Sequence, residues 1–320
     1  MLNRRRALAG AALLALTVSA GAQDYPTKPV RLIIPFPPGG SNDVVGRMIA
    51  TKLGERLGRQ IVVDNRGGAG GTIGTEIAAN AAPDGYTISV ISIAHAVNPW
   101  LYRLSYDPIK SFAPVAVLAT GPNVLAVNPA LGVNSVKELV ALARSKLGEL
   151  QYASAGVGSF QHLGGELFKL EAGVDMLHVP FKGGGPAMVD VIGGHTKLLF
   201  SSLVQTTPHL KSGKLKALGT GGRTRTAILP DVPTIAEAGV PGYEATNWWG
   251  IVAPAGTPPA IVAKLQQEIA AVQRSPDVQE QFARQGASVL QMSPAEFAAF
   301  IQSETAKWGR VVKEGKLTKE

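Results

Sequence analysis

The stretch Pro35-Phe36-Pro37-Pro38-Gly39-Gly40-Ser41-Asn42-Asp43 decides the fold around it. The β-branched run at 30–34 before it predicts a buried strand, and apolar residues at helical spacing from Val44 onward predict a helix. Glycines leave the backbone open to an approaching ligand. The first N–H groups of a helix have no internal partner and carry the positive end of its dipole. The turn therefore suits an anion such as a carboxylate, although an ordinary strand-to-helix turn without a ligand needs the same glycines.

The first 22 residues differ in character from the rest of the chain. Three arginines at 4–6 are followed by an apolar run at 7–18 and by Ala20-Gly21-Ala22. This order predicts a secretory signal peptide over residues 1–22, cut before Gln23. The arginine pair also resembles a twin-arginine signal, so the export route stays open. We expect the mature protein in the periplasm.

The amino-acid composition limits the classes of protein to which the chain can belong. The chain has 320 residues, of which 45% are hydrophobic and 17% charged, which is globular and long enough for two domains. It has no cysteine, so neither a disulfide nor a thiolate site is possible. The formal net charge is +8, but the basic residues are scattered. We interpret them as a solvated surface and expect no nucleic-acid partner.

Strand and helix patterns alternate along the chain, which predicts an α/β fold of two domains with mostly parallel sheets flanked by helices. Strand-like runs at 115–118 and 124–127 are separated by Thr120-Gly121-Pro122-Asn123, where we place the first crossing between domains. The return crossing lies near Trp248 and Trp249, of which one is expected in the core and one at the cleft. The predicted domains are 23–122 with 247–320, and 123–246. A short helix is expected at 230–239.

No catalytic or metal-binding pattern is persuasive. Ser154 lacks the first glycine of a G-x-S-x-G elbow, no phosphate-binding loop motif occurs, and the five histidines are dispersed. We expect neither a cofactor nor a metal. Instead, small residues occupy three strand-to-helix turns, at 39–41, 155–159 and 183–185. Because ligands bind beyond the carboxyl ends of parallel strands, these turns are predicted to face one another and to hold carboxylate oxygens.

Individual side chains have alternative interpretations. His95 stands at a strand end, where it could donate to a carboxylate or be a structural histidine. His162 lies in the first turn of a helix, so capping competes with ligand contact. Lys182 beside a glycine run could be a counter-charge for an anion or an ordinary surface lysine. For Asp43 and Arg47, four residues apart, a salt bridge or helix cap is favoured over ligand contact.

The chain resembles the Bug family, the extracytoplasmic receptors of tripartite tricarboxylate transporters. The motifs that carry this resemblance span the mature chain and are Tyr25-Pro26-x-Lys28-Pro29-Val30, Pro35-Phe36-x-Pro38-Gly39-Gly40-Ser41-x-Asp43, Asp64-Asn65-Arg66-x-Gly68-Ala69-Gly70-Gly71, Pro83-Asp84-Gly85-Tyr86-Thr87, Tyr152-Ala153-Ser154-Ala155-Gly156-x-Gly158-Ser159-x-x-His162-Leu163, Val179-Pro180-Phe181-Lys182-Gly183 and Leu229-Pro230-Asp231-Val232-Pro233-Thr234. The resemblance implies a Venus-flytrap periplasmic binding fold, similar to type II. It also implies a carboxylated ligand, held by the turn after the first strand and by the loops at 154–159 and 182–183.

Together, the turns and the resemblance predict a periplasmic receptor that captures a small organic carboxylate and delivers it to inner-membrane transporter subunits. The resemblance implies a di- or tricarboxylate, an acidic amino acid or an aromatic acid as the ligand, and a monomer is expected. The predicted ligand-binding residues are Phe36, Pro38, Gly39, Gly40, Ser41, Asp43, Ser92, His95, Ser154, Ala155, Gly156, Gly158, Ser159, His162, Lys182, Gly183 and Ser201. One alternative is a subunit that presents its ligand to a membrane sensor kinase. A second is an exported serine hydrolase that uses Ser154 or Ser159 with His162.

Overall fold

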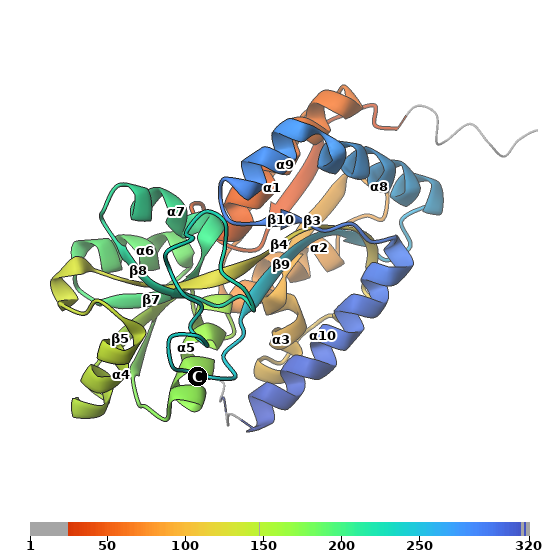
Figure 1. The fold of residues 1–320 in the computed structure, drawn as a ribbon. Coiled ribbons are helices and arrows are strands. Elements are labelled where there is room, and N and C mark those ends of the chain that lie inside the picture. Colours follow the sequence, from red (N-terminus) through yellow and green to blue (C-terminus); the bar gives the residue numbers. More distant parts are fainter. Residues whose placement is uncertain (1–24, 147, 315–316, 318–320) are drawn as a thin grey trace, which may run out of the picture.

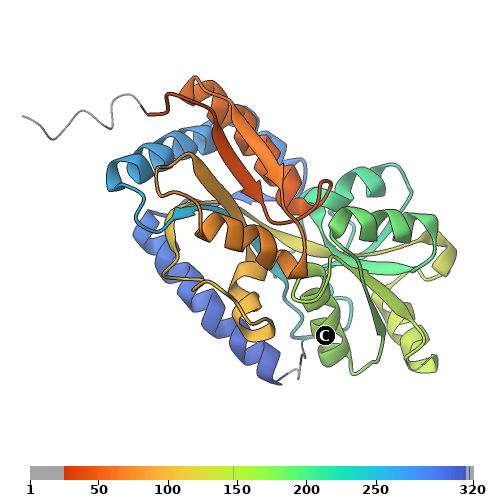
Figure 2. The ribbon, with the colours of Figure 1, turned by 180° about the vertical axis from the view of Figure 1, so that it is seen from behind.

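A computed structural model describes residues 25–146, 148–314 and 317 of the chain. Its strands form one continuous mixed sheet in the order β2-β1-β3-β9-β4-β7-β5-β6, with β8 and β10 also paired to β4. Figures 1 and 2 show from opposite sides that the sheet carries two halves, one coloured red, orange and blue and the other green. The predicted signal peptide and its cleavage point lie outside the described residues.

The first half is built on three parallel strands, β1 (Val30–Ile34), β2 (Ile61–Asn65) and β3 (Thr87–Ser92). Alternate side chains of a strand point to opposite faces of a sheet. Leu32 and Ile34 therefore pack with α1 (Ser41–Leu57), α8 (Pro259–Arg274) and α9 (Pro276–Ala283). Ile33 packs on the other face, with α2 (Thr72–Ala79), α3 (Ile93–Leu101) and α10 (Pro294–Glu314). Both faces of the sheet are thus covered by helices.

The second half repeats this layering. Its parallel strands are β5 (Gln151–Ser154), β6 (Leu177–Pro180) and β7 (Leu198–Ser202). Tyr152 and Phe200 face α4 (Val136–Ser145) and α5 (Phe160–Ala172), whereas Ala153 and Leu199 face α6 (Gly184–Gly193) and α7 (Leu203–Lys211). The remaining elements are β8 (Lys216–Thr220), β10 (Ser288–Val289) and two 3₁₀ turns, η1 (Ala69–Gly71) and η2 (Pro129–Leu131).

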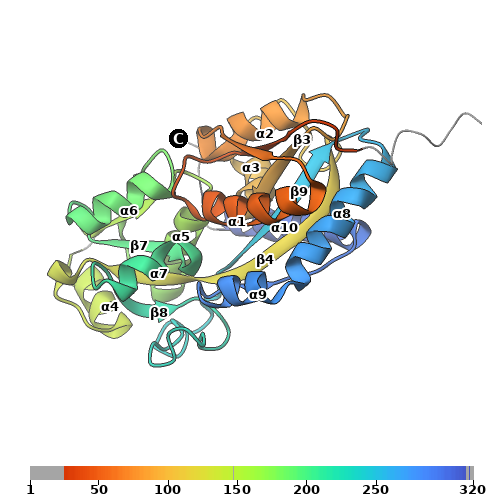
Figure 3. The same ribbon diagram turned by 90° about the horizontal axis from the view of Figure 1, so that it is seen from above.

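Two long antiparallel strands, β4 (Phe112–Val127) and β9 (Thr246–Pro254), join the halves, as Figure 3 shows from above. β4 pairs with β9 as far as Pro122 and with β7 from Asn123 onward. The predicted break at 120–123 is wrong, because pairing to β9 carries the strand through Gly121 and Pro122 and overrides their turn preference. β4 thus changes its pairing partner from β9 to β7 between residues 122 and 123, where the sequence also places the domain boundary. The domain limits themselves stay a prediction.

Two further expectations are wrong. Residues 230–239 form turns rather than a helix, because Thr220 in β8 donates its N–H to the Pro233 carbonyl and accepts the Ile235 N–H, and because Gly239, at φ 111°, ends the segment. Both tryptophans are buried, with Trp248 2% and Trp249 0% exposed, and neither is among the described residues that line the hollow between the two halves. The Trp248 indole N–H instead donates to Glu304 at 3.1 Å. No helix in the described part of the chain is both long and apolar enough to cross a bilayer.

Candidate ligand-binding site

A narrow cavity of about 40 Å³ lies where the two halves meet, at the carboxyl ends of the parallel strands. Both halves and the crossing strand β9 contribute to its wall. The described residues that line it are all uncharged: Phe36, Gly40, Ser41, Asn42, Ser92, Ala94, Ala155, Ser159, Phe160, Gln161, Gly184, Ser202, Gln205 and Asn247. Most of them are polar, so the cavity offers hydrogen bonds without a fixed side-chain charge.

Five helices of the described chain begin at this cavity, namely α1, α3, α5, α6 and α7. Their N-cap residues are Gly40, Ser92, Ser159, Gly183 and Ser202, and only the Ser159 side chain accepts a capping hydrogen bond. The other four helices keep uncapped N–H groups at their first turns. Because each helix N-terminus carries a positive partial charge, the five termini together favour the binding of an anion in the cavity.

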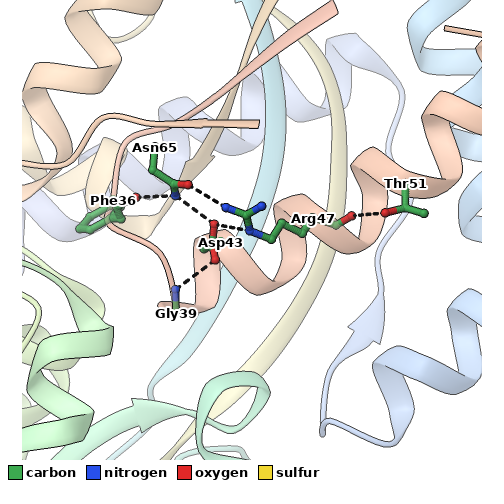
Figure 4. Close-up of polar contacts among 6 residues, drawn as sticks. All are labelled: Phe36, Gly39, Asp43, Arg47, Thr51 and Asn65. Atoms are coloured by element: carbon green, nitrogen blue, oxygen red, sulfur yellow. Dashed lines mark hydrogen bonds and ion pairs between the residues drawn. The ribbon is translucent and has the colours of Figure 1, made fainter. Parts of the chain in front are cut away.

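The turn between β1 and α1 is held by a hydrogen-bonded network around the buried carboxylate of Asp43 (Figure 4). Asp43 accepts the Gly39 N–H at 3.0 Å, the Asn65 amide at 2.9 Å and the Arg47 guanidinium at 2.9 Å. Asn65 also donates to the Phe36 carbonyl at 2.9 Å. Gly39 has φ 82°, a conformation that favours glycine. Asp43 and Arg47 therefore shape the turn, as the sequence favoured, and Asp43 does not line the cavity.

The glycine turn at the start of α6 packs directly on this first turn. A Cβ atom on Gly183 would lie 2.7 Å from the Pro37 ring, and one on Gly185 would lie 2.7 Å from the Pro38 carbonyl oxygen. A Cβ atom essentially never comes this close to another heavy atom, so glycine at these two positions permits the close approach of the two halves. Pro38, Gly39 and Gly183 thus act through close packing beside the cavity rather than in its wall.

A second hollow of about 230 Å³ adjoins the cavity and shares Phe36 and Ala155 with it. Its wall includes Gly156, Lys182 and the glycine-rich turn at 68–71. The Lys182 side chain is exposed and is the charged group of this outer wall. The two hollows together extend from the helix termini toward the surface.

Six predicted residues line the inner cavity, and two more line the outer hollow. The inner group comprises Phe36, Gly40, Ser41, Ser92, Ala155 and Ser159, and the outer pair comprises Gly156 and Lys182. The remaining predicted residues lie in neither wall: Pro38, Gly39, Asp43, His95, Ser154, Gly158, His162, Gly183 and Ser201. His95 is buried against Tyr106 and Phe112, and its Nε2 lies 2.7 Å from the Pro108 carbonyl oxygen.

The serine and histidine pairs do not form as the hydrolase alternative requires. Ser154 is fully buried and its hydroxyl lies 2.6 Å from His178 Nε2. Ser159 meets only the backbone N–H of His162, at 3.3 Å, and the His162 ring accepts from the Gly158 N–H. Burial lowers the pKa of His162 to about 4 and that of His178 to about 3, with His162 adding to the effect on His178. These groups support the loop beneath the cavity.

Sequence reasoning missed eight residues of the inner wall: Asn42, Ala94, Phe160, Gln161, Gly184, Ser202, Gln205 and Asn247. Several of these residues are adjacent in sequence to a predicted one, as Ser202 is to Ser201. In those cases the prediction found the right segment but the wrong side chain facing the cavity. Gln205 and Asn247 carry no local signal, because Gln205 follows the start of α7 without a glycine or serine motif of its own and Asn247 lies on the crossing strand β9.

A larger hollow of about 710 Å³ lies on the outer surface of the first half, along α1 and the edge strand β2. Among the described residues, those that line it all belong to the first half, and several of them are exposed. In the described residues, no group of three or more potential metal ligands occurs there or elsewhere. The inter-domain cavity is therefore the candidate site.

Known proteins share this architecture. A family described as "Tripartite tricarboxylate transporter family receptor" matches residues 45–317. The structure of the periplasmic binding protein BugD is similar at 35% identity and a TM-score of 0.89, over 92% of this chain and 100% of that one. Rpa4515 of R. palustris with adipate is 38% identical, with a TM-score of 0.90, over 93% and 100%. MatC of Rhodopseudomonas palustris with bound malate is 34% identical, with a TM-score of 0.86, over 90% and 100%.

These similarities extend over nearly the whole described fold, including both halves and the crossing strands. They confirm the predicted fold class, a two-domain periplasmic binding protein of the Venus-flytrap kind. The chain accordingly belongs to the Bug family of tripartite tricarboxylate transporter receptors.

Proposed function

We propose that this protein is a periplasmic solute-binding protein that captures a small organic carboxylate between its two domains and delivers it to a tripartite membrane transporter. The observation that carries the proposal is the convergence of five helix N-termini on a cavity lined by uncharged residues. The similar structures of Rpa4515 with adipate and MatC with malate support a carboxylate as the ligand.

In this proposal the carboxylate occupies the inner cavity and the rest of the ligand extends into the outer hollow, toward Lys182. Uncapped N–H groups and the hydroxyls of Ser41, Ser92 and Ser202 donate to its oxygens. Each helix terminus contributes about 0.3–1 kcal/mol to an anion, so five contribute roughly 1.5–5 kcal/mol. The protein does no covalent chemistry, acts as a monomer, and reaches the periplasm after removal of residues 1–22.

Closure follows from the same arrangement. The domains, 23–122 with 247–320 and 123–246, move about the crossings in β4 and β9. The ligand stabilises the closed form because only that form brings α1 and α3 of one domain together with α5, α6 and α7 of the other.

A thermal-shift screen of organic acids against their matched amides tests the proposal. A ligand that binds only the folded state raises the melting temperature. At least one acid is expected to stabilise the protein, while its amide, which lacks the charge, binds at least about tenfold more weakly. The pairs succinate with succinamide and adipate with adipamide provide the comparison. Equal stabilisation by an acid and its amide would contradict an anion site built from helix termini.

A further inference from the structure

The side-chain amide of Gln161 is held in one orientation by a chain of hydrogen bonds that ends on a backbone carbonyl. Gln205 Nε2 lies 2.6 Å from the Gly184 carbonyl oxygen, which can only accept. The other end of the Gln205 amide is therefore its oxygen, and it accepts from the Ser201 hydroxyl at 3.4 Å. Ser201 has one proton and gives it to Gln205. It must then accept from Gln161, whose Nε2 lies 3.0 Å away.

This chain leaves the oxygen of Gln161 as a fixed acceptor. Gln161 lines the inner cavity, is only 4% exposed, and its Oε1 has no hydrogen-bond partner among the described residues. Asn247 Oδ1 in the same wall is also unpartnered. The inference rests on Gln161, because the described bonds fix the orientation of its amide. A buried acceptor without a donor is unfavourable, so an occupant that donates a hydrogen bond to it is favoured over one that does not.

A carboxylate cannot be that donor, because an ionised carboxylate only accepts hydrogen bonds. A hydroxyl or an ammonium group on the ligand could donate. The five helix N-termini place positive partial charge around the cavity, which disfavours an ammonium group and leaves a hydroxyl unaffected. The cavity of about 40 Å³ holds little beyond a carboxylate and the carbon next to it.

We propose that this receptor selects 2-hydroxy acids, the hydroxyl donating to Gln161 Oε1 while the carboxylate faces the helix termini. This inference rests on the proposed function and narrows its substrate class. Ser201 does not line the cavity and is a positioning residue, since it only holds the Gln161 amide in place.

Isothermal titration calorimetry on the purified protein tests the selection with acids that differ by one group. The pairs are lactate with propionate, malate with succinate, and mandelate with phenylacetate, using both enantiomers of each hydroxy acid. In the pair of the best-fitting size, the hydroxy acid is expected to bind roughly 5- to 100-fold more tightly. Aspartate is expected to bind more weakly than malate.

The outcomes distinguish a failure of the 2-hydroxy-acid selection from a failure of the proposed function. Equal affinity of the hydroxy acid and its deoxy partner, or tighter binding of aspartate than of malate, would overturn the selection of 2-hydroxy acids and leave the carboxylate receptor standing. Binding of none of these acids or of those in the thermal screen would overturn the proposed function, and this inference with it.

Three variants locate the cause of the discrimination. Gln161→Met removes the acceptor at nearly constant length, so the affinity ratio of the pair should fall close to one. Ser201→Ala frees the Gln161 amide to turn its NH₂ inward, so the ratio should also fall although no ligand contact is lost. Ser41→Ala is the matched control, which should weaken both acids and keep their ratio. An unchanged ratio in folded Gln161→Met or in Ser201→Ala would overturn the assignment. If Gln161→Met fails to fold, Ser201→Ala and the wild-type pairs still decide it.

Discussion

Replacing Gly40 by valine tests whether the ligand sits at the turn between β1 and α1. Gly40 lines the cavity and precedes the first residue of α1. Its backbone is extended, with φ −82° and ψ 166°, a conformation that valine adopts readily. A Cβ atom there would lie 3.8 Å from Gly184 N and from the Pro37 carbonyl oxygen, which is ordinary contact. The variant should therefore fold.

The two methyl groups of valine reach beyond Cβ, either against the start of α6 or into the cavity of about 40 Å³. Overpacking of this kind costs about 1–3 kcal/mol. The penalty falls on the closed, ligand-bound form, because Gly40 and Gly184 belong to different halves and separate when the cleft opens. We therefore expect the affinity to fall by roughly 5- to 150-fold from overpacking alone. Blocked access to the first N–H groups of α1 adds to that loss.

Circular dichroism and thermal unfolding first establish that Gly40→Val folds. Calorimetric titration then measures its affinity for the acid that gives the largest thermal shift with the wild-type protein. Gly40→Ala is the graded control: its single methyl fits, so its affinity should stay within a few-fold of wild type. A folded Gly40→Val protein that binds within twofold of wild type would place the ligand elsewhere and refute the reasoning.

Two further predictions concern pH and closure. Burial lowers the pKa of His95 and of His162 to about 4, whereas the unfolded chain protonates near 6.5, so their contribution to stability is full above pH 6.5 and is lost as the pH falls toward 4. At pH 5 the free energy of unfolding should be lower than at pH 7 by about 2 kcal/mol for each histidine. Urea unfolding at the two pH values measures this difference, and equal stability would contradict the prediction. Small-angle scattering should give a smaller radius of gyration with saturating ligand than without, and an unchanged radius would argue against closure.

Local sequence was enough to predict the first strand, the turn after it and the helix that follows. The β-branched run at 30–34, the glycines and the helical spacing after Asp43 all lie within about one turn of the feature they specify, so they act whatever the rest of the chain does. The same holds for the ion pair of Asp43 with Arg47, which is set by helical periodicity. The alternation of strand and helix and the motifs shared with the Bug family were likewise sufficient for the fold class.

The tertiary structure decided which side chains meet. Ser202 rather than Ser201 lines the cavity, because strand register and the start of α7 set the direction of each serine. Gln161 presents an oxygen only because Ser201 and Gln205, 40 and 44 residues away, fix its amide. β4 runs unbroken through Pro122 because β9, over a hundred residues later, pairs with it. Sequence patterns report interactions between neighbours along the chain, whereas this cavity is made by five helix termini that only folding brings together.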